Sequence, residues 1–366
     1  MLLHRRRFSP IGVDVGLESV KLVQVVREGD ETEVCALARH RFSSPHRSHT
    51  QAEEDAVEAV RSLRRDVRFH GREAVACLSG DQVLVRHVRL PRDHEGDLTA
   101  AVRREVEEHL PELLRQATVR FIVAGETTER GEAMVEVIVV AAAEEVVQSK
   151  VRMLRRMHLV PVGLDLDTCA LHRCFVRPSR RSSERSDVAA FVDVGYGGTR
   201  VVISGDGRPV FIKTLARGGA DFDKTALQET GLREEQLEAL RRASAARRDA
   251  DEAEPALWEQ LLQDDALSAT LFRSLRTQFT QLASEVLNCL RYFHGTFPGI
   301  KVGRLTLTGG AAATVGLRRV LMERTGVPVT LGNPLRALGV REGVDVGPFP
   351  ALWGVGLGLA FKDLAS

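Results

Sequence analysis

Near the N-terminus of this 366-residue chain, residues 11–25 read IGVDVGLESVKLVQV. Two apolar runs flank a short polar turn, and this pattern predicts a β-hairpin that begins a sheet. The stretch also places Asp14, Gly16, Ser19 and Lys21 close together in sequence. Such a set suits a metal-bound phosphate, because carboxylates order the waters of Mg²⁺ and glycine admits backbone N–H groups to phosphate oxygens. A hairpin with an ordinary polar turn explains the same residues, so this stretch alone leaves both interpretations open.

The same sequence pattern recurs in the second half of the chain, where residues 189–204 read AAFVDVGYGGTRVVIS. In both places a strand ends in Asp-Val-Gly, a polar turn follows, and a valine-rich strand resumes. Chance accounts for one occurrence more easily than for two that each head one half of the chain. The repeat therefore predicts two related lobes, with Asp14 on one and Asp193 on the other.

Composition bounds the class of protein. With 43% hydrophobic and 28% charged residues, the chain has enough apolar material for two domains or one bilobed domain. A net charge of +1 gives no argument for a nucleic-acid partner. The longest apolar runs, at 135–143 and 352–361, are too short to span a membrane. Five cysteines without a C-x-x-C spacing indicate reduced thiols of a cytoplasmic protein.

Further along the chain, strand and helix patterns predict a mixed unit at about 70–165 that interrupts the first sheet, and a polar linker at 178–187. Residues 265–294 carry an apolar stripe at helical spacing, which we interpret as core. The pair Gly309–Gly310 follows a strand and either admits a flat base or forms a plain strand-to-helix turn. Residues 353–361, WGVGLGLAF, do not match G-x-G-x-x-G, and no P-loop motif occurs.

Three segments, at 11–25, 191–204 and 305–317, together resemble the phosphate 1, phosphate 2 and adenosine motifs of the actin-like ATPase superfamily. Within it the chain is most similar to the PilM family of type IV pilus assembly proteins. The D-x-G-x-x-S-x-K-L-V run in the first segment, R-x-x-x-L-P at 86–91 and GVPVTLGNPL at 326–335 are typical of that family. The order and spacing of these motifs cover nearly the whole chain.

This resemblance implies an α/β actin-like ATPase fold, with two lobes around a nucleotide cleft and an inserted mixed α/β subdomain of the FtsA/PilM type. The first lobe is expected at 1–187, with its insertion at about 70–165. The second lobe is expected at 188–340, with a helical part at about 217–298. The segment 341–366 is expected to return to the first lobe as a helix.

The resemblance also implies a site for ATP or ADP with Mg²⁺, in which Asp14 and Asp193 hold the metal through water and Asp193 is the candidate catalytic residue. Leu17 and Tyr196 stand where the family has small residues, and Arg241 stands where it has lysine. The implied nucleotide-binding residues are Asp14, Gly16, Leu17, Glu18, Ser19, Lys21, Asp193, Gly195, Tyr196, Gly197, Thr199, Gly218, Gly219, Glu238, Arg241, Gly309 and Gly310.

The function implied by the resemblance is that of a cytoplasmic adaptor at the inner face of the inner membrane. It would bind ATP and dock the N-terminal cytoplasmic tail of a PilN-like inner-membrane protein, together with other pilus or secretion components. The alternatives are a degenerate nucleotide-free scaffold, an active actin-like ATPase, or an FtsA-like filament protein. Hydrolysis needs a residue that orients the attacking water, and the sequence nominates only Asp193. Because the chain ends directly after the last core helix, we expect neither the terminal amphipathic helix of FtsA nor the membrane span of GspL-type proteins.

Overall fold

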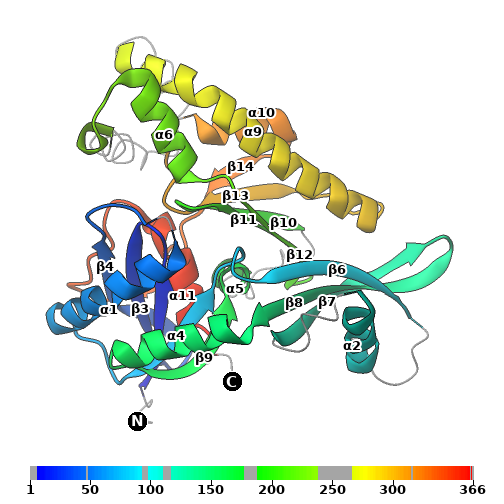
Figure 1. Cartoon of the computed structure of the whole chain (residues 1–366), viewed down its shortest axis with the longest axis horizontal. Helices are drawn as coiled ribbons and strands as arrows, with labels where there is room; N and C mark the ends of the chain where they lie inside the picture. The colour runs from blue at the N-terminus through cyan, green and yellow to red at the C-terminus, as the bar shows by residue number, and fades with distance from the viewer. Residues whose placement is uncertain are drawn as a thin grey trace.

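The computed structural model describes residues 6–46, 48–92, 98–109, 117–176, 188–237, 266–314, 316–362 and 364. Figure 1 shows two sheet-based lobes, one above the other, and a third sheet that extends to the side. Within the described residues, no helix is long and apolar enough to cross a membrane. All five cysteines are free thiols, as the sequence predicts.

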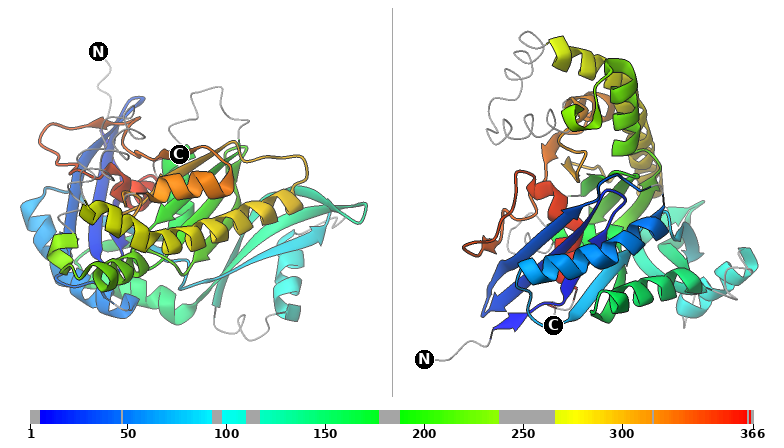
Figure 2. Two further views of the ribbon diagram at one scale, coloured as in Figure 1. Left: turned by 90° about the horizontal axis from the view of Figure 1, so that it is seen from above. Right: turned by 60° about the vertical axis from the view of Figure 1, so that its left-hand side comes forward.

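The first lobe is built on a seven-stranded sheet in the order β15-β4-β3-β2-β5-β9, with β1 paired to β3. The hairpin predicted at 11–25 is confirmed as β2 and β3, and every residue of β2 is buried. Helices α1 (His49–Asp66) and α4 (Glu144–Arg156) contact each other and cover one face of this sheet (Figure 2). The strands are β1 (Arg7–Phe8), β2 (Ile11–Val15), β3 (Ser19–Glu28), β4 (Glu31–Arg41), β5 (Glu73–Leu78), β9 (Val160–Leu166) and β15 (Gly339–Val340).

The second lobe repeats this arrangement with a five-stranded sheet in the order β12-β11-β10-β13-β14. In both lobes the central strand, β2 or β10, pairs antiparallel with the next strand and parallel with a later one. The repeat predicted from the two Asp-Val-Gly segments is therefore confirmed as a repeat of topology. The strands are β10 (Ala189–Val194), β11 (Thr199–Gly205), β12 (Arg208–Leu215), β13 (Arg304–Thr308) and β14 (Val329–Leu331).

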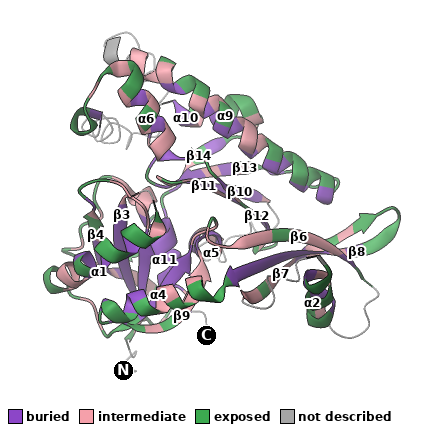
Figure 3. Cartoon of the chain, viewed as in Figure 1, coloured by how far each residue is buried: buried purple, intermediate pink, exposed green. Residues whose placement is uncertain are grey.

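Helices α6 (Gly219–Thr230), α9 (Ala266–Thr296) and α10 (Leu317–Thr325) cover the second lobe. The apolar stripe predicted on α9 packs into the main hydrophobic core, with Phe279, Leu282 and Val286 fully buried. Figure 3 colours several stretches of α9 as buried. This burial confirms the interpretation of the stripe as core.

The third sheet has the order β6-β8-β7 and consists of β6 (Leu84–Pro91), β7 (Ala117–Glu129) and β8 (Glu132–Ala143). Helix α2 (Leu98–His109) packs on one face of it through Val102 and Val106. The Thr127 hydroxyl of β7 donates a hydrogen bond to the carbonyl of Thr296 in α9, so the third sheet contacts the second lobe. The expected interval of about 70–165 also contains β5 and most of β9, which pair with each other in the first sheet. We therefore propose narrower bounds of 84–143 for the inserted unit.

Helices α5 (Asp167–Val176) and α11 (Gly354–Ala360) connect the lobes, and a 3-10 turn at Pro350–Trp353 leads into α11. Helix α11 packs on α5 and on strands β2 and β3, so the C-terminal segment returns to the first lobe. Its glycines permit this approach, because a Cβ at Gly358 would lie under 3.0 Å from the backbone of Ala170. The predicted linker at 178–187 lies outside the described residues.

Candidate functional site

Two matching turns face each other where the lobes meet. The turn that joins β2 to β3 is closed by a hydrogen bond from the Gly16 N–H to the Ser19 carbonyl, 3.0 Å long. The turn that joins β10 to β11 is closed by the same bond, from the Gly195 N–H to the Gly198 carbonyl, also 3.0 Å. The repeated sequence thus produces the same local geometry on both sides of the cleft.

Each turn carries a cross-strand ion pair at the same register. Asp14 lies opposite Lys21, and its Oδ2 is 2.8 Å from Lys21 Nζ. Asp193 lies opposite Arg200, and its Oδ2 is 2.9 Å from Arg200 Nη1. Sequence reasoning missed Arg200, although the identical spacing from aspartate to cation in both turns was a signal that could have found it.

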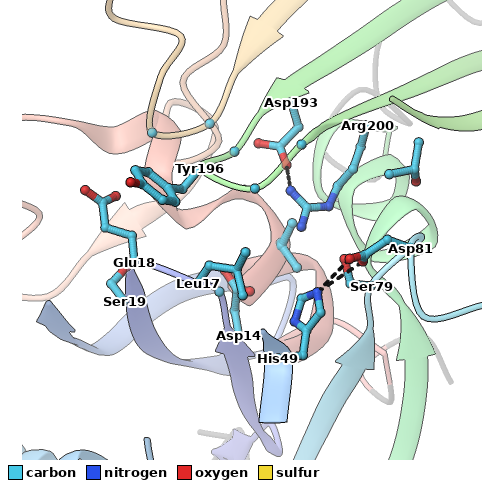
Figure 4. Close-up of a pocket in the computed structure, with 18 of the residues that line it drawn as sticks. Asp14, Leu17, Glu18, Ser19, His49, Ser79, Asp81, Asp193, Tyr196 and Arg200 are labelled. Atoms are coloured by element: carbon cyan, nitrogen blue, oxygen red, sulfur yellow. Dashed lines mark hydrogen bonds and ion pairs between the residues drawn. The ribbon is translucent and has the colours of Figure 1, made fainter. Parts of the chain in front are cut away.

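The turns enclose a cavity of about 200 Å³, and a second cavity of about 50 Å³ adjoins it beside Tyr196, Gly310 and Leu352. Residues from both lobes and from the β13 end line the larger cavity (Figure 4). Ligand pockets of drug-sized molecules commonly measure about 300–1,000 Å³. In this arrangement the larger cavity is therefore smaller than a typical ligand pocket.

Leu17 lies across the cleft against the opposite turn. A Cβ placed on Gly197 would lie 2.5 Å from Leu17 Cδ1, so the leucine of the first turn rests on the glycine of the second. Figure 4 shows Leu17 between the two turns. This apolar contact joins the two turns across the cleft.

Most of the expected nucleotide-binding residues lie at these cavities. Gly219 lines the smaller cavity, and Gly310 lines both. Glu238 and Arg241 lie outside the described residues. The expected residues that line the larger cavity are Asp14, Gly16, Leu17, Glu18, Ser19, Lys21, Asp193, Gly195, Tyr196, Gly197, Gly309 and Gly310.

Two expected residues line neither cavity, and each has a structural role instead. Thr199 is fully buried, and its hydroxyl donates to the Arg217 carbonyl at 2.7 Å. A Cβ at Gly218 would lie under 3.0 Å from backbone atoms of the second turn. These contacts hold the second turn against the start of α6.

The structure adds polar residues that sequence reasoning did not nominate. His49, at the start of α1, and Asp81, in the turn after β5, both line the larger cavity, and His49 Nε2 is 2.9 Å from Asp81 Oδ2. The hydrogen bond from His49 holds the pKa of Asp81 well below its ordinary value. Nothing local in the sequence marks these residues, because α1 and the β5–β6 turn meet only in the folded chain.

The electrostatics of the cleft centre on Arg200. Its Nε donates to Asp167 at the start of α5, while its Nη1 donates to Asp193. Burial acts to lower the pKa of Arg200, but the carboxylates of Asp167 and Asp193 more than offset burial and raise it well above its ordinary value. Burial also raises the pKa of Asp193, with Arg200 opposing this effect. The guanidinium is thus permanently charged and lies between two carboxylates.

The residues expected to hold Mg²⁺ do not fit it in this arrangement. Magnesium binds through carboxylate oxygens and retained waters. Asp14 and Asp193 are each engaged by a cationic side chain, Lys21 and Arg200 respectively. A divalent cation that binds Asp193 at Oδ2 would have to displace the guanidinium.

Comparison with known proteins places this geometry in a family. The chain resembles the solved PilM-PilN type IV pilus biogenesis complex, with a TM-score of 0.73, 23% identity, and coverage of 98% of this chain and 99% of that one. It also resembles ethanolamine utilization protein EutJ from Carboxydothermus hydrogenoformans, with a TM-score of 0.54, 14% identity, and coverage of 97% and 89%.

The expected fold class is confirmed as an actin-like ATPase fold. The family described as "Type IV pilus assembly protein PilM" matches residues 12–362, almost the entire chain. With its two lobes, its paired Asp-Val-Gly turns and its third sheet, the chain belongs to the PilM family of type IV pilus assembly proteins.

Proposed function

We propose that this protein is a cytoplasmic adaptor of type IV pilus assembly that docks the N-terminal cytoplasmic tail of a PilN-like inner-membrane protein. The observation that carries the proposal is the family match over residues 12–362. The related PilM-PilN complex, which has the same fold over 98% of this chain, supports it. The tail is proposed to dock where the inserted sheet meets the first lobe, which places the adaptor at the inner face of the inner membrane.

A nucleotide, ATP or ADP, is proposed to bind between the two turns when the lobes part. Two features support this part of the proposal. Backbone N–H groups in glycine-rich turns form concave sites for anions, and two such turns face each other here. Gly310 lines the two cavities from the end of β13, which leaves a path from the turns toward α6 for a nucleoside.

The partner assignment is tested with a synthetic peptide that carries the cytoplasmic tail of the PilN-like protein from the same cell, titrated calorimetrically into the full chain. A scrambled peptide is the control. We expect saturable binding of the tail alone, and a photo-crosslinker in the peptide should label the boundary between β7 and α4, where Thr118 Oγ1 lies 3.2 Å from Glu144 Oε2. Equal binding of both peptides, or labelling confined to the cleft, contradicts the proposal.

The nucleotide assignment is tested at Leu17. Replacing Leu17 with alanine removes the contact with Gly197 and widens the cleft. We expect ATP affinity, measured by calorimetry, to rise about tenfold, which corresponds to ~1.4 kcal/mol. Gly310→Val is the opposing variant, because its side chain enters the space beside Leu352, which both cavities share. It should lose ATP binding and keep tail binding. Unchanged ATP binding in both variants places the nucleotide elsewhere.

A further inference from the structure

We propose that Arg200 is the resident cation of the cleft: it fills the position expected for Mg²⁺ and keeps divalent cations out. The nucleotide part of this proposal rests on the proposed function. Its metal part concerns the chain's own side chains and requires no nucleotide.

The contacts of Arg200 join three parts of the chain. The guanidinium comes from β11, and it donates to Asp193 at the end of β10 and to Asp167 at the start of α5. Asp167 Oδ2 also accepts a hydrogen bond of 3.2 Å from the N–H of Gly80, in the turn after β5. Arg200 therefore links the strand that carries the second turn to a carboxylate anchored on the first lobe.

Burial makes these contacts strong and costly to break. The side chain of Asp167 is 1% exposed, that of Asp193 is 8% exposed and that of Arg200 is 18% exposed. A planar guanidinium that donates to two carboxylates matches their geometry and keeps its charge at any pH the protein meets. Removing one member of such a group leaves a buried charge without a partner.

A hydrated divalent cation would be attracted to the place between the carboxylates that the Arg200 guanidinium occupies. Asp14, Asp167 and Asp193 act together on Arg200, and all three raise its pKa. Lys21 neutralises Asp14, so Arg200 is the charge that balances the other two. A divalent cation placed there meets the guanidinium at short range, and like charges repel strongly in a buried site. Without Arg200, the carboxylates of Asp167 and Asp193 face each other with no guanidinium between them, and carboxylates bind Mg²⁺ or Mn²⁺ together with retained waters.

The test is Mn²⁺ binding to the full, nucleotide-free protein, followed by the loss of the free-ion signal in electron paramagnetic resonance. We expect wild type to bind no Mn²⁺ in the cleft. Arg200→Ser should gain one Mn²⁺ with at least about a tenfold increase in affinity, and the gain should disappear when Asp193→Asn is added. Arg173→Ser is the matched control, because it removes another arginine that pairs with a carboxylate, Asp165, at 2.7 Å outside the cleft.

Each outcome decides the proposal. Arg200→Lys keeps a cation and should stay free of Mn²⁺. If Arg200→Ser does not fold, Arg200→Gln, which is neutral, longer than serine and still able to form hydrogen bonds, carries the same expectation. Wild type that binds Mn²⁺ in a manner abolished by Asp193→Asn overturns the proposal. So does a folded neutral variant that gains no Mn²⁺, because Arg200 is then not what excludes the metal.

The nucleotide measurement separates this proposal from the proposed function. ATP affinity of wild type should differ by less than about twofold between Mg²⁺ and a chelator, whereas Arg200→Ser should bind ATP more tightly with Mg²⁺. A tenfold or greater benefit of Mg²⁺ in wild type overturns the assignment of Arg200. Absence of ATP binding in both conditions overturns only the nucleotide part of the proposed function. The Mn²⁺ titration on nucleotide-free protein still tests whether Arg200 excludes the metal.

Discussion

Replacing Glu136 with alanine is expected to lower the free energy of unfolding by about 3 kcal/mol, the lower end of the cost of breaking a buried ion pair, because its partner Arg89 is 31% exposed. Glu136 lies on β8 and is 0% exposed. Its Oε2 accepts from Arg89 Nε at 3.1 Å, and its Oε1 lies 3.4 Å from both His87 Nδ1 and the Tyr292 hydroxyl. Alanine removes the buried carboxylate that these polar groups share, and it leaves Arg89 paired with the exposed Glu129.

This joint fastens the inserted sheet to the second lobe. His87 and Arg89 belong to β6, Tyr292 belongs to α9, and Arg89 also donates to Thr296 Oγ1 at 3.1 Å. His87 Nε2 lies 3.2 Å from the carbonyl of Ile212 in β12. Loss of Glu136 should therefore loosen the inserted sheet as a unit, which hydrogen exchange in β6 and β8 can detect alongside urea unfolding.

Glu129→Ala is the matched control for this prediction. Glu129 pairs with the same Arg89, at 3.4 Å, but its side chain is 45% exposed. An exposed pair contributes only about 0–1 kcal/mol, because water and salt screen it. Equal losses from the two substitutions would mean that burial is not what gives Glu136 its effect.

Gly358→Ala is the second substitution for which we expect a large effect. The added Cβ would lie under 3.0 Å from three backbone atoms of Ala170, so α11 cannot keep its place against α5. Backbone cannot rotate away as a side chain does, and the strain should cost at least about 3 kcal/mol. Helix α11 also receives a hydrogen bond of 2.7 Å from Arg173 to the Gly358 carbonyl, which a displaced helix would lose.

Gly295→Ala offers a control that adds the same methyl group in open space. A Cβ at Gly295, near the end of α9, meets nothing within 4 Å. Alanine should stabilise this helical position by up to about 0.5–1 kcal/mol, because glycine has more conformational freedom to lose on folding. The two substitutions should thus shift the urea midpoint in opposite directions, and a stable Gly358→Ala protein contradicts the packing of α11 on α5.

Local patterns in the sequence were sufficient to predict the two lobes. Alternation of apolar residues around Asp14 and Asp193 predicts the β2–β3 and β10–β11 hairpins, because the side-chain period of a strand is two residues. The stripe on α9 follows from helical periodicity in the same way. The limits of the inserted unit were harder to predict from the sequence. The residue pattern of a strand such as β5 is the same whichever sheet the strand joins.

In the candidate site too, some features followed from local sequence and others only from the tertiary structure. The sequence by itself determined which turns carry aspartate, glycine and cation, because those residues lie within a few positions of one another. Only the tertiary structure decided that Arg200 reaches Asp167 on α5, that His49 meets Asp81, and that Leu17 rests on Gly197. These contacts join residues distant in sequence, and their existence depends on how the lobes close. No local periodicity carries that information, because side chains so far apart meet only after the sheets and helices have packed.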